Sequence, residues 1–319
     1  MKVQSLRLGA LALAAGTLFC GGAAAQMAAS ARGPHKHLDP YYNVCRGISP
    51  ECFNDWHAFD SLPLKVLIYS RTAGPRHANL GTPMAAGLNP AMNGDNVMQA
   101  GLVRMLAAAG ISADWTEDVT VLAGRINNYT AVIFASSNRD TLWNSAATTS
   151  NDAARTALRN YMRRGGGFVG LHNAFGAEYN WPYYEGLLGN ANFYNHAANR
   201  SGTVEIVAHD PSTAGVPRRF EFQDEWYNLE PFPTQVKFLA KVDTDTLNPP
   251  TAAPHPGHPD FHPVAWCQYY DGGRSWVTTL GHNAHSFADG GTGPGAAAFQ
   301  RLVVQGVKSV MGLIPFCTQ

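Results

Sequence analysis

The residues best suited to chemistry in this sequence are histidines and carboxylates that follow apolar, strand-like segments. Histidine changes its charge near neutral pH and a carboxylate accepts a proton, so together they can act as general acid and general base. Asp224 and Glu225 are adjacent, and side chains alternate between the faces of a regular strand, so only one of them is expected to face a pocket. Asp224 could instead pair structurally with an arginine such as Arg274. The catalytic candidates are His77, His172, Asp224, Glu225 and His282.

A metal ion is the alternative use of the same residue types, because zinc and similar ions prefer imidazole and carboxylate ligands. The histidines are scattered, without an H-E-x-x-H helix or another closely spaced ligand pair, so the spacing leaves a divalent metal cofactor open. If a metal is bound, we expect its ligands among His172, His196, Glu225 and His282.

Strand-like and helix-like segments alternate through the first half of the chain. Continuous apolar runs of about five residues are typical of strands buried on both faces, whereas apolar residues three and four apart predict helices. This alternation predicts an α/β fold with right-handed crossovers and a mainly parallel sheet that is covered on both faces. We expect strands at 64–69, 111–115, 131–135 and 168–171, and helices at 96–109, 151–164 and 297–311.

The second half is richer in strands, which must extend the edge of the sheet or form a hairpin. The Asp-Gly-Gly sequence at 271–273 suits the turn of such a hairpin. Five prolines predict a surface loop at 248–260. We expect strands at 203–207, 220–229, 236–242, 264–270 and 276–280.

One strand end concentrates polar and aromatic residues. Ligands of parallel sheets bind beyond the C-terminal ends of the strands. The expected strand at 168–171 runs into a turn that carries His172 and Asn173, so this pair is expected to face the ligand crevice. Glu178, Tyr179 and Trp181 follow closely, so the turn concentrates acid, imidazole and aromatic groups.

The candidate residues are expected to converge, although they lie far apart in the sequence. We expect His77, His172, Glu225 and His282 to gather over one rim of the parallel sheet, beyond the C-terminal ends of its strands.

The first 25 residues have the features of a secretory signal peptide, in which two basic residues precede an apolar run that ends in three alanines. Cleavage after Ala25 would give a secreted or periplasmic protein. The apolar run is shorter than the ~20 residues that span a bilayer, so no membrane insertion is expected. The remaining chain divides into an N-terminal arm at 26–62 and a single domain at 63–319.

Four cysteines remain after that cleavage, an even number for an oxidising compartment, so two disulfides are expected. Four cysteines allow three pairings, and we favour the one in which Cys45 and Cys52 close a small loop. Cys267 would then join a late strand to Cys317 near the C-terminus. A catalytic thiol or a zinc-thiolate cluster is the alternative, but the sequence contains no C-x-x-C.

The charge balance argues against nucleic acid or anionic lipid as partners. Removing Lys2 and Arg7 reduces the 23 basic residues to 21, against 23 acidic ones, so the processed chain carries a net charge of −2. Such a balance does not attract polyanions. Aromatic residues are abundant and could stack on the rings of a small-molecule carbohydrate, although most are expected to lie in the core, and the oligomeric state stays open.

Several motifs in the same order resemble those of the ThuA-like family, which is linked to trehalose utilisation. Residues 165–189 read GGGFVGLHNAFGAEYNWPYYEGLLG and are similar to the family's glycine-rich strand and the acidic and aromatic stretch after it. The resemblance covers roughly residues 64–315. Shorter matches are RH at 76–77, DEWYN at 224–228, HPVAW at 262–266, GGR at 272–274 and GH at 281–282.

That family resembles class I glutamine amidotransferase-like domains, which implies a flavodoxin-like three-layer sandwich with a mainly parallel sheet. In those domains the same strand end carries a nucleophilic cysteine within G-x-C-x-G. Residues 170–174 read GLHNA here, so the thiol is absent and amidotransferase chemistry is not expected. A flavin or nucleotide is also disfavoured, because the first turn lacks a glycine-rich phosphate cradle.

The resemblance implies carbohydrate metabolism outside the cytoplasm, on trehalose or a related glycoside or keto-glycoside. Hydrolysis, elimination and isomerisation all need a positioned acid and base, so the reaction type stays open. The alternative is a non-catalytic module that binds sugars or a partner. Pro75 and Ala197 depart from the family pattern and bear on substrate identity. The motifs imply that substrate-binding residues include Arg76, Asn173, Glu178, Trp181, Tyr183, His196, Trp226, Tyr227, His262 and Arg274.

Overall fold

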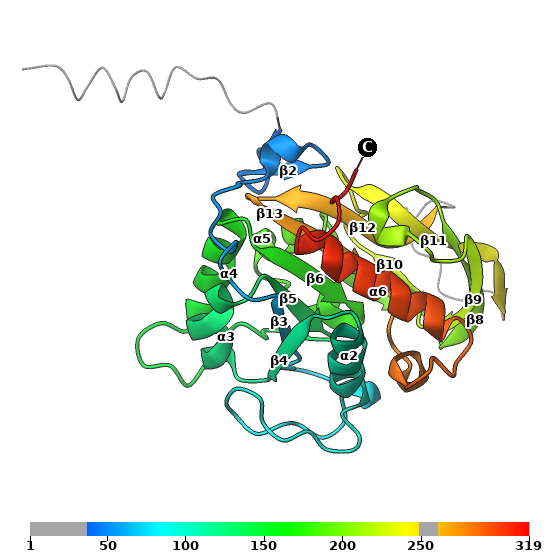
Figure 1. The fold of residues 1–319 in the computed structure, drawn as a ribbon, viewed down its shortest axis with the longest axis horizontal. Coiled ribbons are helices and arrows are strands. Elements are labelled where there is room, and N and C mark those ends of the chain that lie inside the picture. The colour runs from blue at the N-terminus through cyan, green and yellow to red at the C-terminus, as the bar shows by residue number, and fades with distance from the viewer. Residues whose placement is uncertain (1–36, 249–260, 319) are drawn as a thin grey trace, which may run out of the picture. The chain divides into compact units, whose positions relative to one another are not determined.

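A sheet of eleven strands runs through the part of the chain that the structure, a computed structural model, describes, namely residues 37–248 and 261–318 (Figure 1). Five neighbouring strands are parallel, as expected for short apolar runs joined by helical crossovers. Their order across the sheet is β4 (Ser112–Thr116), β3 (Lys65–Tyr69), β5 (Ala131–Ala135), β6 (Gly167–Leu171) and β13 (Gly273–Thr278).

Antiparallel strands continue the sheet beyond β13. The hairpin between β12 and β13 turns at Asp271 and Gly272, where φ is 48° and 95°, so the predicted turn is confirmed. Glycine adopts such positive φ values without strain. In order from β13, the antiparallel strands are β12 (His262–Tyr270), β11 (Lys237–Asn248), β8 (Arg200–Ile206) and β9 (Arg219–Asp224).

Helices cover both faces of the sheet and complete three layers (Figure 1). One face packs against α2 (Val97–Ala108) and α6 (Ala296–Val310). The other face packs against α3 (Val119–Arg125), α4 (Ala153–Arg163) and α5 (Pro182–Leu187). Alternate residues of the same strands, such as Val66 and Leu67, point into opposite cores. The predicted α/β class is therefore confirmed.

The expected strand at 220–229 is broken in two. β9 ends at Asp224 and a separate strand, β10 (Tyr227–Leu229), pairs with β7 (Phe193–His196) in a second, two-stranded sheet. The Asp224 carboxylate accepts hydrogen bonds from backbone N–H groups instead of lying on a regular strand face. Glu225 therefore stands at a bend between two sheets.

The N-terminal part of the described chain joins the large sheet through β2 (Val44–Gly47), which pairs with β12 and with β1 (Leu38–Asp39). Both predicted disulfides are confirmed. Cys45 bonds to Cys52, and Cys267 on β12 bonds to Cys317. Short 3-10 helices complete the chain at Pro50–Cys52, Ala78–Leu80, Ile126–Asn128, His172–Gly176, Pro211–Thr213 and Ala284–Phe287.

Two predictions concern residues outside the described part of the chain. These are the signal peptide at 1–25 and almost all of the proline-rich loop at 248–260. Among the residues that are described, none of the helices combines the length and apolar character needed to cross a membrane.

Candidate active site

Four side chains from distant segments meet beyond the C-terminal ends of the parallel strands, where such sheets bind ligands. His77 follows β3, His172 follows β6 directly and His282 follows β13, while Glu225 comes from the bend after β9. One ligand atom from each of the four lies within 4.8 Å of the others. The sequence-based expectation that these residues gather at one rim of the sheet thus agrees with their placement.

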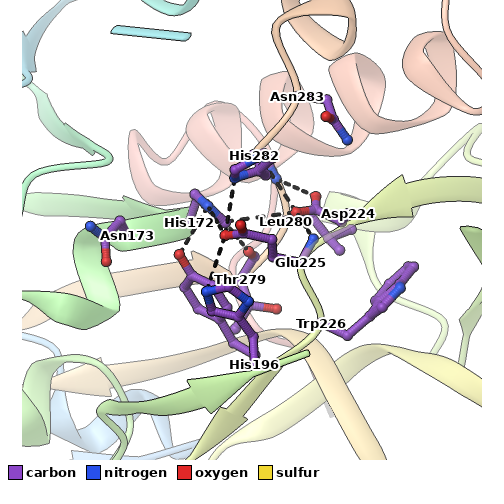
Figure 2. Close-up of polar contacts among 12 residues, drawn as sticks. His172, Asn173, His196, Asp224, Glu225, Trp226, Thr279, Leu280, His282 and Asn283 are labelled. Carbon is purple, nitrogen blue, oxygen red and sulfur yellow. Dashed lines mark hydrogen bonds and ion pairs between the residues drawn. The ribbon is translucent and has the colours of Figure 1, made fainter. Parts of the chain in front are cut away.

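A single carboxylate oxygen, Glu225 Oε2, lies at the centre of this cluster (Figure 2). The nearest imidazole nitrogen is His282 Nδ1 at 3.0 Å, and His196 Nε2 lies at 3.5 Å. His172 Nε2 follows at 3.7 Å and His77 Nε2 at 3.8 Å. Glu225 therefore contacts four imidazole rings from four different segments.

His172 is held in one tautomer by the strand beside it. Its Nδ1 lies 2.8 Å from the carbonyl oxygen of Thr279, which can only accept, so Nδ1 carries the proton and Nε2 presents a lone pair to the cluster. The Tyr227 hydroxyl donates to that Nε2 over 2.9 Å, and its ring stacks on the imidazole. Burial lowers the pKa of His172 well below its usual range, and the charge of His77 lowers it further. His172 is therefore a neutral acceptor.

The backbone of His172 has a φ of 49°, in the left-handed region that non-glycine residues rarely occupy. Its side chain is fully buried. Such strain persists only where the surrounding structure fixes it, and it concentrates at functional sites. The left-handed backbone in the turn after β6 thus gives the His172 imidazole an orientation that a regular strand end would not give it.

His77 lies against His172 and is held by its neighbours. The two Nε2 atoms are 3.1 Å apart, and Asn173 Nδ2 lies 3.4 Å from His77 Nδ1. Asn79, two residues later, donates to the carbonyl oxygen of Gly281 over 2.8 Å. This bond ties the segment that carries His77 to the segment that carries His282.

Asp224 positions the loop after β13 and does not face the centre of the cluster. Its carboxylate accepts hydrogen bonds from the backbone N–H groups of Gly281 at 2.7 Å, Glu225 at 2.8 Å and His282 at 3.3 Å. Burial raises the pKa of Asp224 to about 7, although these amides oppose the shift. Glu225 therefore faces the imidazoles and Asp224 faces backbone, but at a bend and not by the alternation of a regular strand.

Glu225 and His282 shift each other's proton affinity. Burial by itself would raise the pKa of Glu225, but contacts with His282 and His77 hold it below its usual range. Burial by itself would lower the pKa of His282, but the Glu225 carboxylate raises it overall. At neutral pH the pair therefore favours an ionised carboxylate beside a protonated imidazole.

A cavity of about 190 Å³ opens beside the cluster. Its wall includes His77, Asn173, His196 and Tyr227 from the predicted set. Three more lining residues, Pro75, Tyr179 and Phe193, lie in segments that the sequence singled out but were not predicted to bind. Sequence reasoning missed Asn138, Arg139 and Gly176, although the rule that singled out His172 also applies to Asn138 and Arg139, which follow β5.

Two predicted binding residues are buried outside the cavity wall and hold the chain segment around Glu225. His262 is buried, and its Nε2 donates to the carbonyl oxygen of Tyr227 over 3.0 Å. Trp226 is buried, and its indole N–H donates to the carbonyl oxygen of Arg200 over 3.1 Å. Both fix the bend that carries Glu225.

Other predicted binding residues form contacts that hold the fold. Arg76 pairs with Glu117 at 2.7 Å, and the fully buried Glu178 pairs with Arg155 at 2.6 Å. Arg274, near the N-terminal end of β13, lies with its guanidinium 3.9 Å from the Phe53 ring centroid. The alternative in which Asp224 pairs with Arg274 is therefore wrong.

The remaining two predicted binding residues, Trp181 and Tyr183, stack on each other with ring centroids 5.1 Å apart. Neither lies in the wall of the cavity beside Glu225.

Sequence comparison assigns this architecture to a family. A family model described as trehalose utilisation, named ThuA, matches residues 65–308. The chain belongs to the ThuA family. No curated protein matches the sequence.

Solved structures of ThuA-like proteins share this fold. One from Bacteroides uniformis is 21% identical, with a TM-score of 0.55 over 78% of this chain and 92% of that one. Another, from Parabacteroides merdae, is 15% identical with a TM-score of 0.53 over 78% and 90%. A glutamine amidotransferase from Thermotoga maritima is 10% identical, with a TM-score of 0.41 over 78% and 98%.

In this ThuA family member a cysteine nucleophile is not available at the strand end. His172 follows β6, and all four cysteines within residues 37–248 and 261–318 are in disulfides. The groups that remain for chemistry are the Glu225 carboxylate, the imidazoles around it and the Tyr227 hydroxyl.

Proposed function

We propose that this protein is an enzyme that processes a glycoside or keto-glycoside by acid–base chemistry at Glu225 and the surrounding histidines. The observation that carries the proposal is the placement of Glu225 Oε2 between 3.0 and 3.8 Å from four imidazole nitrogens. Such an arrangement supplies proton donors and acceptors that operate near neutral pH.

The protonation states support distinct roles within the cluster. Because its pKa is lowered, Glu225 is ionised at neutral pH, which is the form that can accept a proton from the substrate. His282, whose pKa is raised, is the donor beside it. Groups whose environments separate their proton affinities are typical of acid–base pairs in enzymes.

A carbohydrate substrate is supported by the family and by the cavity wall. The family model is described as trehalose utilisation. Tyr179, Phe193 and Tyr227 contribute rings to the cavity, and Asn138 and Asn173 contribute amides. Aromatic rings pack against the apolar faces of sugars, while amides bond to hydroxyl groups. The predicted signal peptide and the two disulfides support a location outside the cytoplasm.

A divalent cation fits the same cluster. His77, His172, Glu225 and His282 provide three imidazoles and a carboxylate, which are ligands that zinc accepts. His172 donates its other ring N–H to a backbone carbonyl, as zinc-binding histidines do. His282 Nδ1 is buried and finds no hydrogen-bond partner among the described residues, although Glu225 lies close. When bound, the cation would polarise a sugar oxygen.

The test is a turnover assay of the purified protein on trehalose and on its keto derivative, with and without added zinc. Replacing Glu225 with glutamine keeps the shape of the side chain and removes its basicity. We expect kcat/KM to fall at least about 100-fold, the size of a typical general-base contribution, while the melting temperature changes little.

The matched control is Glu221→Gln, which removes an exposed carboxylate from the same segment. This variant should keep full activity. Equal turnover by wild-type protein and the Glu225→Gln variant would reject the proposal. Sugar binding without any product would favour the non-catalytic module instead.

A further inference from the structure

A second groove lies along α4, lined by residues that differ from those around the Glu225 cavity. Its volume is about 380 Å³. Three arginines of α4, at 155, 159 and 163, form one stripe because residues four apart share a helix face. Trp143, from the segment after β5, and Trp181, just before α5, complete the aromatic part of the wall.

The outer two arginines of the stripe are neutralised by carboxylates. Arg155 bonds to Glu178 through Nε at 2.7 Å. Arg163 bonds to Asp271 through Nε at 2.9 Å. These two guanidinium groups therefore contribute to the shape of the groove more than to its charge.

Arg159, between them, has no such partner. No carboxylate in the described ranges lies within ion-pair distance of it, and its buried Nε forms no hydrogen bond there. Its guanidinium instead lies over aromatic faces, 4.7 Å from the ring centroid of Tyr183 and 5.8 Å from that of Trp181. Rings hold a guanidinium in place without using its N–H donors. The Nε of Arg159 is buried, so its terminal N–H groups are the donors that remain for an anion.

Trp143 adds an apolar surface beside this charge. Its side chain is 40% exposed, unusual for so large an aromatic residue. The guanidinium of Arg155 lies 5.4 Å from its ring centroid and restrains it. A restrained, exposed indole is a flat surface against which the apolar face of a sugar ring can pack.

We propose that this groove binds a sugar that carries a carboxylate, a uronic acid unit, with the carboxylate on Arg159 and the ring on Trp143. A guanidinium matches a carboxylate through two parallel hydrogen bonds, and the opposite charges make these bonds about twice as strong as those to the neutral hydroxyl groups of a sugar. The proposal concerns binding alone and does not depend on the reaction at Glu225.

The groove and the cavity are neighbours along the chain. Tyr179 lines the cavity and Trp181 lines the groove, so their Cα atoms lie at most about 7 Å apart. In the same way Arg139 lines the cavity and Trp143 lines the groove. The two hollows therefore share the same two chain segments in their walls.

Isothermal titration calorimetry of the full chain with tetragalacturonate tests the proposal, with maltotetraose as the neutral probe. Wild-type protein should bind tetragalacturonate and bind maltotetraose at least about 10-fold more weakly. Arg159→Gln should weaken tetragalacturonate binding at least about 10-fold, as expected when a charged hydrogen-bond donor is lost.

A control variant separates this site from other effects. Arg125→Gln removes an exposed arginine from α3 and should leave binding unchanged. Equal binding by the Arg159→Gln variant and wild-type protein would overturn the proposal, as would equal binding of the two tetrasaccharides. Displacement of tetragalacturonate by an equal concentration of acetate would show a simple anion site and also overturn it.

Discussion

Glu225 brings four imidazoles together although only His282 approaches within 3.0 Å of its carboxylate. The other three rings are held by separate partners, such as Thr279 for His172 and Asn173 for His77. A cluster whose members are fixed independently can lose or gain a proton, or bind a cation, without rearranging. This preorganisation is what both acid–base catalysis and metal binding need.

The proposed cation site predicts that removal of one ligand weakens zinc binding. His282→Asn removes one imidazole, and we expect zinc affinity to fall at least about 100-fold. Loss of an outer-shell partner already costs about 10- to 100-fold, so loss of a direct ligand should cost at least as much. Isothermal titration calorimetry with zinc measures the change in affinity. His209→Asn replaces an exposed histidine outside the cluster and is the control. An unchanged affinity in His282→Asn would rule out this residue as a ligand.

At the scale of single residues, the sequence predicted the histidines and Glu225 of the cluster better than the residues that surround the cluster. His172 is recognisable because it follows a strand-like segment, and Glu225 because it is a carboxylate within the DEWYN match at 224–228. Arg76 and Glu178 follow similar segments but are used in ion pairs that hold loops. Both kinds of residue lie in or near the matching motifs, so the resemblance by itself does not separate them.

At the scale of elements, the break between β9 and β10 is what turns Glu225 toward the histidines. A continuous strand over this segment would continue the large sheet, whereas β10 pairs with β7 and brings Tyr227 beside His172. The strand pattern of residues 220–229 predicts extended structure throughout and does not reveal the break. The bend depends on backbone donors from Gly281 and His282, which are far away in the sequence.

The parallel strands and the longer helices could be predicted because their apolar periodicity is strong. Short elements could not. α3 has 7 residues and α5 has 6, so neither presents enough turns for a helical period to stand out. β7 is only partly buried and carries the polar sequence FYNH. Its strand geometry comes from pairing with β10, which is a tertiary effect.

Close packing of α6 on the sheet gives a prediction at the same scale. A Cβ added at Gly306 would lie 2.5 Å from the buried Trp276 ring, so Gly306→Ala should lower the free energy of unfolding by about 1–3 kcal/mol. Gly124 on α3 has open space around its Cα, so Gly124→Ala should raise it by about 0.5–1 kcal/mol. Urea denaturation measures both. The two variants are expected to change the free energy of unfolding in opposite directions, and stabilisation by Gly306→Ala would contradict the packing.

At the scale of the whole domain, the site exists only because the sheet brings together segments that are distant in the chain. His77 and His282 come from opposite ends of the sequence, yet their rings lie 5.3 Å apart. The two segments are joined by the bond from Asn79 to the carbonyl oxygen of Gly281. The sequence predicted this convergence from the rule that parallel strands present their C-terminal ends at one edge.

A double-mutant cycle on kcat/KM tests the claim that His77 and His282 serve one catalytic site. The variants are His77→Asn, His282→Asn and the two combined, assayed on the sugar that the wild-type protein turns over. Residues that act as a unit are strongly non-additive, so the double variant should be about as slow as the slower single variant. Single effects that multiply in the double variant would show that the two histidines act independently, and would contradict the account.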